Sequence, residues 1–264
     1  MISLSDVNVT YNPGTPLETQ ALRNINFKVP EGQFVTVIGS NGAGKSTSLN
    51  VIAGIAPLMS GKVEVDGQDV TDWPVHKRSK ILSRVFQDPK MGTCEDLSIL
   101  ENFALAHGRT SPRRFLKAVT AELREKTAQR IKVLGLGLES RLDDKVGLLS
   151  GGQRQAVSLL MATTGDTKVL LLDEHTAALD PKTAEFVLDL SNRVVAEMGL
   201  TVVMVTHSMA QALSTGERTI MFHRGQIVFD AAGSDRDGME VKDLLELFKK
   251  QQGEELTDDA LLLA

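Results

Sequence analysis

A glycine-rich segment, residues 39–46, has the composition and spacing of a loop that binds phosphate groups: a glycine, four residues and then Gly-Lys-Ser. Glycines let a backbone turn tightly and direct successive N–H groups at an anion, and the N-terminus of a following helix favours negative charge. Lys45 would contact the β- and γ-phosphates, and the Ser46 hydroxyl would ligate Mg²⁺. The segment therefore predicts a Mg²⁺-nucleotide site formed by Gly39, Ser40, Asn41, Gly42, Ala43, Gly44, Lys45, Ser46 and Thr47.

Two acidic residues, Asp173 and Glu174, follow the apolar run Val169–Leu172. Carboxylates at the end of a buried strand are costly unless they have a partner or a chemical role. Asp173 can hold the Mg²⁺ shell, and Glu174 can polarise a water molecule for attack on a γ-phosphate. The alternative, a strand that simply leaves the core through acidic residues, explains the pair when it is considered alone. The phosphate loop elsewhere in the chain favours the catalytic interpretation.

Two further segments point to the same chemistry. His207 follows the apolar strand-like run Thr201–Val205, so it would lie beside the other two strand ends. In the segment Leu149–Gln153, Ser150 is a good N-cap, and the helix N-terminus with two glycines is a second anion site. Because the chain has one lysine loop for two phosphate-seeking elements, we expect a dimer in which the second element of one subunit closes on the nucleotide of the other.

The elements that must position these residues alternate between strands and helices. Period-two alternation predicts strands near the N-terminus, Asp66-Gly67 predicts a hairpin turn, and two edge strands near Ile220 and Ile227 are expected to join at Arg224-Gly225. Three buried strands are predicted to end at Ile38, Leu172 and Val205. This pattern indicates an α/β fold with a mostly parallel central sheet, whose strand ends carry the functional residues.

Residues 89–146 are richer in charge and helix formers, which predicts an inserted helical subdomain. Ser111-Pro112 predicts a helix start, with Phe115, Val119 and Leu123 on one face. Two later amphipathic helices are expected, and the acidic segment 251–264 is interpreted as a loose tail. The later helices carry Val187, Leu190, Val194 and Met198 after a cap at Asp180, and Val241, Leu244, Leu245 and Phe248.

Composition limits the classes of function. The chain has 264 residues and a net charge of −5, which fits one large domain and argues against a broad nucleic-acid-binding face. The single cysteine, Cys94, excludes a disulfide within the chain, so a reducing compartment is expected. The N-terminus has no signal-peptide pattern, and no apolar run approaches the roughly 18 residues needed to cross a bilayer. We therefore expect any membrane role to act through a partner.

Taken in order, these motifs make the chain resemble the ATP-binding subunit of an ABC transporter over nearly its full length. Tyr11 matches an aromatic that stacks on adenine, and Gln87 matches the glutamine loop that joins the helical subdomain. Asp180, in Ala178-Leu179-Asp180, matches a loop that crosses the dimer interface, and His207 matches the histidine that contacts the γ-phosphate. One position departs from the pattern: His175 stands where the family usually has proline after the catalytic glutamate.

The resemblance implies an ABC-type phosphate-loop ATPase fold with an antiparallel β subdomain. It implies a catalytic domain over 1–250, with a core at 1–88 and 147–250, and a dimer that binds ATP and Mg²⁺. The implied partners are permease subunits at the cytoplasmic face of the inner (plasma) membrane and a separate substrate-binding protein, with no nucleic acid. The implied site comprises Glu174, His207 and Gln87 for catalysis, Ser46, Gln87 and Asp173 for the metal, and Ser150, Gly151, Gly152, Gln153 and Asp180 from the opposite subunit.

Three kinds of ABC protein remain to be distinguished. DNA-repair and chromosome ATPases would need long coiled coils, and residues 89–146 are too short and lack heptads. Translation factors of the superfamily usually carry two such domains in one chain. The chain more closely resembles an importer subunit, and the segments 86–93 and 172–181 resemble those of amino-acid uptake systems. A subunit of an exporter or a lipid-handling system is the remaining alternative.

Overall fold

The computed structural model describes residues 1–109 and 118–252, and the chain divides into two compact units. The first unit contains Met1–Arg78 and the chain from Leu200 onward, and the second contains Ser79–Gly199. The second unit is therefore larger than the helical insertion expected at 89–146, because two strands and a long helix group with that insertion. Within the described residues, no helix combines the length and apolar character needed to cross a membrane.

The first unit contains an antiparallel sheet in the order β2-β1-β4-β5. Its alternating sequence buries one face, including Leu4, Val7 and Val9 on β1. Asp66 and Gly67 have φ values of 54° and 71°, so they form the predicted hairpin turn. The four strands are β1 (Ile2–Tyr11), β2 (Thr19–Val29), β4 (Ser60–Val65) and β5 (Gln68–Asp69).

A second group of strands in this unit is built around β3 (Phe34–Gly39), which pairs in parallel with β8 (Thr201–Val205) and with β9 (Arg218–His223). The strands β3 and β8 are buried throughout, as continuous apolar runs predict. The strand β10 (Gln226–Ala232) pairs with β9 in the expected hairpin. The prediction of two edge strands is wrong for β9, because this strand pairs with both β10 and β3, and its residues 219–222 are buried.

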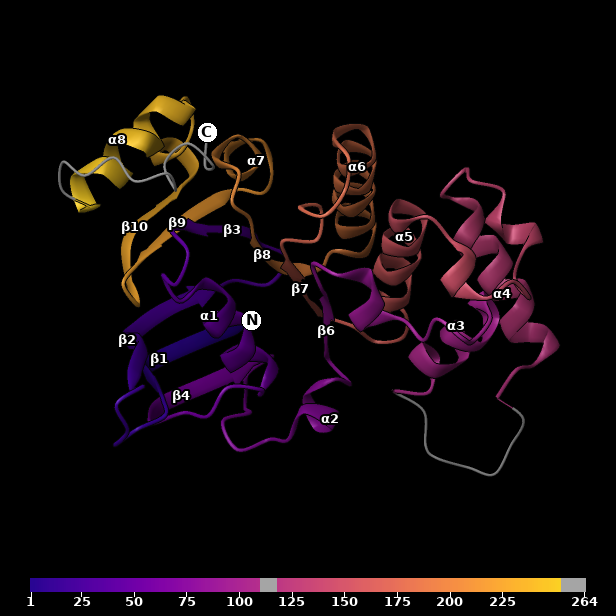
Figure 1. Ribbon diagram of the computed structural model, residues 1–264, viewed down its shortest axis with the longest axis horizontal. Helices are drawn as coiled ribbons and strands as arrows, with labels where there is room; N and C mark the ends of the chain where they lie inside the picture. The colour runs from indigo at the N-terminus through magenta and orange to yellow at the C-terminus, as the bar shows by residue number, and fades with distance from the viewer. Residues whose placement is uncertain (110–117, 253–264) are drawn as a thin grey trace. The chain divides into compact units, whose positions relative to one another are not determined.

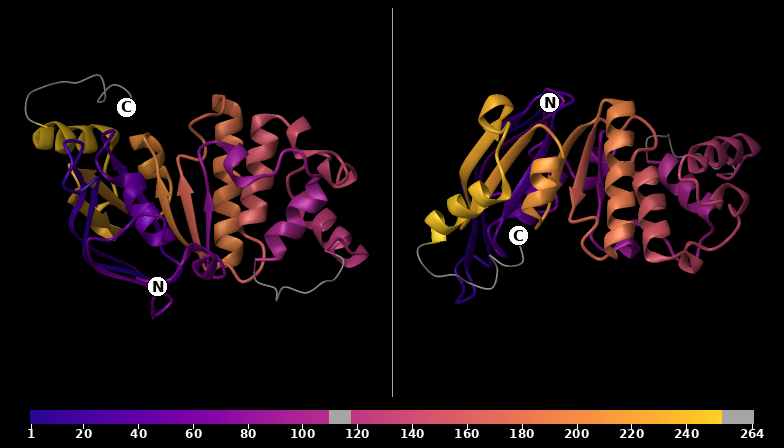
Figure 2. Two further views of the ribbon diagram at one scale, coloured as in Figure 1. Left: turned by 60° about the horizontal axis from the view of Figure 1, so that its bottom comes forward. Right: turned by 90° about the horizontal axis from the view of Figure 1, so that it is seen from above.

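Among the described residues, the α-helices of the first unit are α1 (Lys45–Ala53), α2 (Val75–Arg78), α7 (Met209–Ser214) and α8 (Val241–Gln252). The apolar face predicted for α8 is confirmed, because Leu244 and Phe248 pack against Ile38 and Met209. This helix lies beside α7 (Figures 1 and 2). It runs to Gln252, so residues 251 and 252 are helical rather than part of the expected tail, and residues 253–264 lie outside the described part.

In the second unit, β6 (Leu82–Val85) pairs in parallel with β7 (Val169–Asp173). Its α-helices, within the part of the chain that the structure describes, are α3 (Ile99–His107), α4 (Ala121–Lys132), α5 (Gly151–Ala162) and α6 (Pro181–Met198). Figure 1 shows α5 and α6 side by side, and the two helices are in contact. Each of the four helices begins with a side chain that accepts a hydrogen bond from a first-turn N–H group, and these caps are Ser98, Thr120, Ser150 and Asp180.

One predicted helix start lies outside the described residues, and one predicted apolar helix face is only partly confirmed. The expected helix start at Ser111-Pro112, with Phe115, lies outside the described residues, and α4 begins after Thr120. On α6, Val187, Leu190 and Val194 are buried as expected, but Met198 is 38% exposed. Steps of four residues advance by about 40° around a helix, so the apolar stripe drifts and Val195 is buried in its place.

Candidate phosphate and water-activating site

The phosphate loop leaves β3 at Gly39 and enters α1 at Lys45. The N-cap of α1 is Gly44, with φ of 104° and no side-chain cap, so no side chain occupies the first-turn N–H groups from that position. A Cβ at Gly39 would lie 2.2 Å from the backbone oxygen of Phe222, so only glycine fits there. The result is the uncapped helix N-terminus that an anion requires.

Lys45 is buried, and its ammonium group lies over the loop. Its Nζ donates to Gly39 O at 2.7 Å and to Ser40 O at 3.0 Å. A buried ammonium needs such partners, and phosphate oxygens could replace them. Ser46 follows on α1, and this residue is exposed.

Segments distant in sequence contact the phosphate loop. The Gly225 N–H donates to Ala43 O at 2.9 Å, and a Cβ at Gly44 would lie 2.8 Å from Ala21 O. The C-terminal end of α1 is capped by Arg78, which donates hydrogen bonds to Val51 O and Ile52 O.

Burial lowers the pKa of the Arg78 guanidinium. Sequence reasoning missed this arginine, because a cap supplied by another element leaves no local pattern.

His207 and the phosphate loop lie at the same end of neighbouring strands. Val37 of β3 pairs with Val205 of β8, and the Thr206 N–H donates to Val37 O at 3.1 Å. The structure thus brings together the loop residues and His207, as the strand-end argument predicts. Tyr11 ends β1, in the other sheet of the same unit, and is partly exposed.

The second unit contains a comparable pair of strand ends. Val85 of β6 pairs with Leu172 of β7, so Gln87 follows β6, while Asp173 ends the neighbouring parallel strand β7 and Glu174 follows it. Gln87 is exposed, and Glu174 has φ of 49°, a conformation that is strained for a residue with a side chain. Such strain is retained where the surrounding structure enforces it, often at functional sites.

An arginine that sequence reasoning missed accompanies this acidic pair. Arg84 forms an ion pair with Asp173, and the two side chains are only 11% and 14% exposed. The guanidinium also lies 4.9 Å from the centre of the Phe86 ring. A charged residue within the short buried strand β6 was the available signal, since such a charge needs a nearby partner.

The segment Ser150–Gln153 forms the predicted helix start, with a capping box. Ser150 Oγ accepts from the Gln153 N–H, and Gln153 Oε1 accepts from the Ser150 N–H. The cap uses the hydroxyl oxygen as an acceptor, so its proton can still be donated to another group. Asp180 caps α6 through Thr183 N–H at 3.2 Å, and hydrogen bonds with Thr183 lower the pKa of Asp180.

His175, the residue that departs from the expected proline, is buried, and its Nε2 lies 2.9 Å from Ser191 Oγ on α6. Burial lowers its pKa from the ordinary 6.5 to about 4. The ring is therefore neutral near pH 7. It anchors the turn after Glu174 to α6 through a side-chain hydrogen bond, which proline could not provide.

Among the described residues, no group of three or more His, Cys, Asp and Glu side chains gathers to hold a metal. The proposed donors, the Ser46 hydroxyl, the Gln87 amide and the Asp173 carboxylate, are all oxygen ligands. Mg²⁺ prefers oxygen and usually takes one or two protein ligands, together with substrate phosphates and water. The donor set therefore fits Mg²⁺ bound with a nucleotide, and the two units carry different members of that set.

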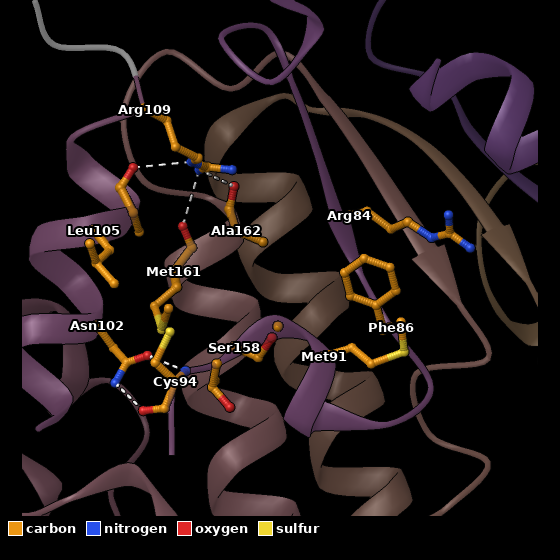
Figure 3. Close-up of a pocket in the computed structure, with 13 residues that line it drawn as sticks. Arg84, Phe86, Met91, Cys94, Asn102, Leu105, Arg109, Ser158, Met161 and Ala162 are labelled. Carbon is orange, nitrogen blue, oxygen red and sulfur yellow. Dashed lines mark hydrogen bonds between the residues drawn. The ribbon is translucent and has the colours of Figure 1, made fainter. Parts of the chain in front are cut away.

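A groove of about 330 Å³ lies elsewhere in the second unit (Figure 3). It is lined by Phe86 and Met91 from the segment after β6, by Leu105 of α3 and by Met161 of α5. Met91 and Leu105 are 69% and 55% exposed, so the groove offers apolar surface to solvent. The single cysteine, Cys94, also lines it.

Comparison with known proteins supports the motif analysis. Residues 22–177 match the family described as ABC transporter. The chain is 43% identical over 229 residues to a tyrosine transport ATP-binding protein of Clostridioides difficile, covering 86% of this chain and 90% of that one. It is 35% identical over 232 residues to the energy-coupling factor transporter protein EcfA2 of Clostridium perfringens, covering 87% and 79%.

A phosphonates import ATP-binding protein of Oceanobacillus iheyensis is 33% identical over 218 residues, covering 81% of this chain and 84% of that protein. Among solved structures, a dimeric post-hydrolysis state of the ATP-binding cassette MJ0796 with ADP and Pi gives a TM-score of 0.76 at 31% identity, covering 88% and 98%. A second dimeric MJ0796 structure gives 0.75 at 32% identity, with the same coverage.

Proposed function

This chain belongs to the ABC transporter family, and from that premise we propose that it powers uptake of an amino acid or a similar small solute through a separate permease. Its fold is that of the ABC ATPases, and it is an ATP-hydrolysing transport subunit. The observation that carries the uptake proposal is the 43% identity to a tyrosine transport protein, which extends over 86% of this chain. The site residues support the ATP-hydrolysing role within this proposal, because each position with a proposed chemical role is present.

In the proposed mechanism, Tyr11 stacks on the adenine, and the residues of the loop Gly39–Thr47 surround the phosphates. Lys45 exchanges its bonds to Gly39 O and Ser40 O for bonds to phosphate oxygens. Ser46, Gln87 and Asp173 would hold Mg²⁺ through oxygen ligands. When bound, the ion neutralises charge that develops on the phosphates. Asp173 would have to share its carboxylate between the ion and Arg84.

Hydrolysis requires a water molecule directed at the γ-phosphate, and we assign its activation to Glu174 as general base. The strained backbone at φ 49° and the anchor through His175 support a fixed direction for this side chain. His207 contacts the γ-phosphate, and Gln87 senses it from the glutamine loop. Gln87, Glu174 and His207 follow three strands, β6, β7 and β8, in the order along the chain that the family pattern implies.

We propose that two copies of the chain share their nucleotides. Ser150, Gly151, Gly152, Gln153 and Asp180 of one copy would then act on the ATP that the other copy binds. The retained Ser150 hydroxyl proton and the N-terminus of α5 support this role, because both favour a phosphate. The solved structures similar to this chain are described as dimeric.

The groove of Figure 3 is the proposed docking surface for the permease. It adjoins the glutamine loop, since Phe86 lines it and Gln87 follows directly in the chain. A helix seated there would move when Gln87 engages or releases the nucleotide, which gives the two-state element that transport needs. The chain would then act at the cytoplasmic face of the plasma membrane. Crosslinks from cysteines near Met91 to a permease would support this assignment, whereas crosslinks only near Ile227 would contradict it.

Reconstitution with the permease tests the direction of transport and the solute. For an importer, a loaded substrate-binding protein on the outer face should raise the ATP hydrolysis rate above that with the unloaded protein. Stimulation by a lipid or an internal solute instead would indicate an exporter or a lipid-handling system. If ATP hydrolysis responds to none of these additions and the chain binds DNA or ribosomes instead, the chain is a non-transport ATPase. In each of these results, the assignment as an ATP hydrolase stands.

A further inference from the structure

One buried amide joins three segments of the proposed site. Gln155, on the first turns of α5, is fully buried, and its Nε2 donates to two backbone oxygens. The acceptors are Phe86 O at 2.9 Å and His175 O at 2.7 Å. Phe86 directly precedes Gln87, and His175 directly follows Glu174. The helix α5, whose N-cap Ser150 belongs to the signature segment Leu149–Gln153, is therefore bonded to the backbone beside both residues.

The orientation of this amide is determined by its surroundings. Both neighbours are carbonyl oxygens, so only the NH₂ group of Gln155 can face them. Its two protons satisfy two carbonyl groups that follow neighbouring strands, β6 and β7. A single side chain therefore bridges the glutamine loop and the turn after Glu174.

The turn after Glu174 is also bonded to α6. Ser191 Oγ donates to Val187 O at 2.8 Å, which leaves it to accept a hydrogen bond from His175 Nε2 at 2.9 Å. His175 thus accepts from α5 through its backbone oxygen and donates to α6 through its ring. Both anchors lie on His175, directly after Glu174, whose φ of 49° requires support from the surrounding structure.

Packing alone does not explain a glutamine at this position. Among the described residues, Gln155 Oε1 is buried and has no hydrogen-bond partner. An unsatisfied buried acceptor is unfavourable, and methionine would fill a similar volume without it. The two donated hydrogen bonds are what distinguishes glutamine from methionine here.

We infer that Gln155 is a positioning residue for hydrolysis, which fixes the glutamine loop and the turn of Glu174 on the signature helix. The inference rests on the proposed role of Glu174 as general base. Through this amide, a displacement of the glutamine loop moves the backbone beside Glu174. Docking at the groove lined by Phe86 could thereby alter the hydrolytic geometry without any contact to the nucleotide.

The test is Gln155→Met, which keeps the volume but removes both donors. We expect kcat for ATP to fall by about 10–100-fold, since a small misplacement of a reacting group has effects of that size. The Kd for ATP of the isolated subunit should change by less than about twofold, because Lys45 and its loop are untouched. Thr201→Val is the matched control: the buried Thr201 hydroxyl also bonds a backbone group, because it accepts from the Gly32 N–H at 2.9 Å, and its loss should leave kcat unchanged.

Two further measurements separate positioning from misfolding. In a Glu174→Gln background, Gln155→Met should leave ATP-dependent dimer formation unchanged, whereas a distorted signature helix would abolish it and overturn the inference. If Gln155→Met fails to fold, Gln155→Asn keeps one donor group on a shorter chain and should give an intermediate loss of kcat. A wild-type kcat in the folded methionine or asparagine variant would overturn the inference. ATP hydrolysis at the wild-type rate by the single variant Glu174→Gln would instead contradict the proposed role of Glu174 as general base.

Discussion

Thr183 of α6 occupies the space that a side chain at Gly152 would need: a Cβ there would lie 2.0 Å from Thr183 Cγ2. The second glycine of the signature segment is therefore required by packing between α5 and α6, in addition to any contact with a nucleotide. Asp180 caps α6 one turn before Thr183, so the same contact connects the signature segment to the loop expected at the dimer interface.

Gly152→Ala should therefore destabilise the subunit even without nucleotide. Overpacking of this kind costs about 1–3 kcal/mol, and it should appear as a lower Tm. Gly151→Ala is the matched control, because its Cβ would meet only Leu179 Cδ2, at an ordinary 3.8 Å. Thermal unfolding of the two nucleotide-free variants measures their Tm values. Equal Tm values would show that α5 and α6 do not pack as described.

Lys45→Ala and Ser150→Arg should separate binding from hydrolysis. Loss of the Lys45 ammonium should weaken ATP binding by about tenfold to a hundredfold, because a charge-assisted contact is removed. Ser150→Arg should leave binding to the monomer intact but abolish hydrolysis, because Ser150 serves the other subunit. Nucleotide titration and phosphate release distinguish the two effects. Equal weakening of monomer binding by both variants would contradict the role of Ser150 in trans.

His175 should make folding stability depend on pH. Its pKa is about 4 in the folded chain and near 6.5 when exposed, so the unfolded chain binds a proton that the folded chain excludes between these values. The stabilisation is fully present above pH 6.5 and is lost as pH falls towards 4, by about 3 kcal/mol. Urea unfolding should show a shallower loss in His175→Gln, which stays neutral. Parallel pH profiles for the two proteins would contradict a buried neutral ring.

Patterns within single segments predicted much of this architecture. The apolar runs that end at Ile38, Leu172 and Val205 are strands, and Asp66-Gly67 and Arg224-Gly225 are hairpin turns. These features depend on local backbone preferences and on burial of consecutive residues. Ser150 was also identifiable as a cap, because its partner lies three residues away.

Long-range contacts between polar groups were not predictable in this way. Gln155 and Arg84 have partners 20 to 89 residues away, and a glutamine on a helix has the same sequence signature whether buried or exposed. The helical period offered one signal, since Leu159 follows Gln155 by four residues and shares its face. The wrong prediction that β9 is an edge strand has the same origin, because the order of strands in a sheet depends on their pairing with distant segments.

Glu174→Gln gives the most direct test of the account, in which Glu174 is the base and two chains share their nucleotides. The amide keeps the shape of the side chain but cannot accept the proton from water, so ATP should bind and remain intact. Size-exclusion chromatography with light scattering in Mg-ATP should show a dimer that retains two ATP molecules. A monomer at every ATP concentration, or turnover at the wild-type rate, would contradict the account.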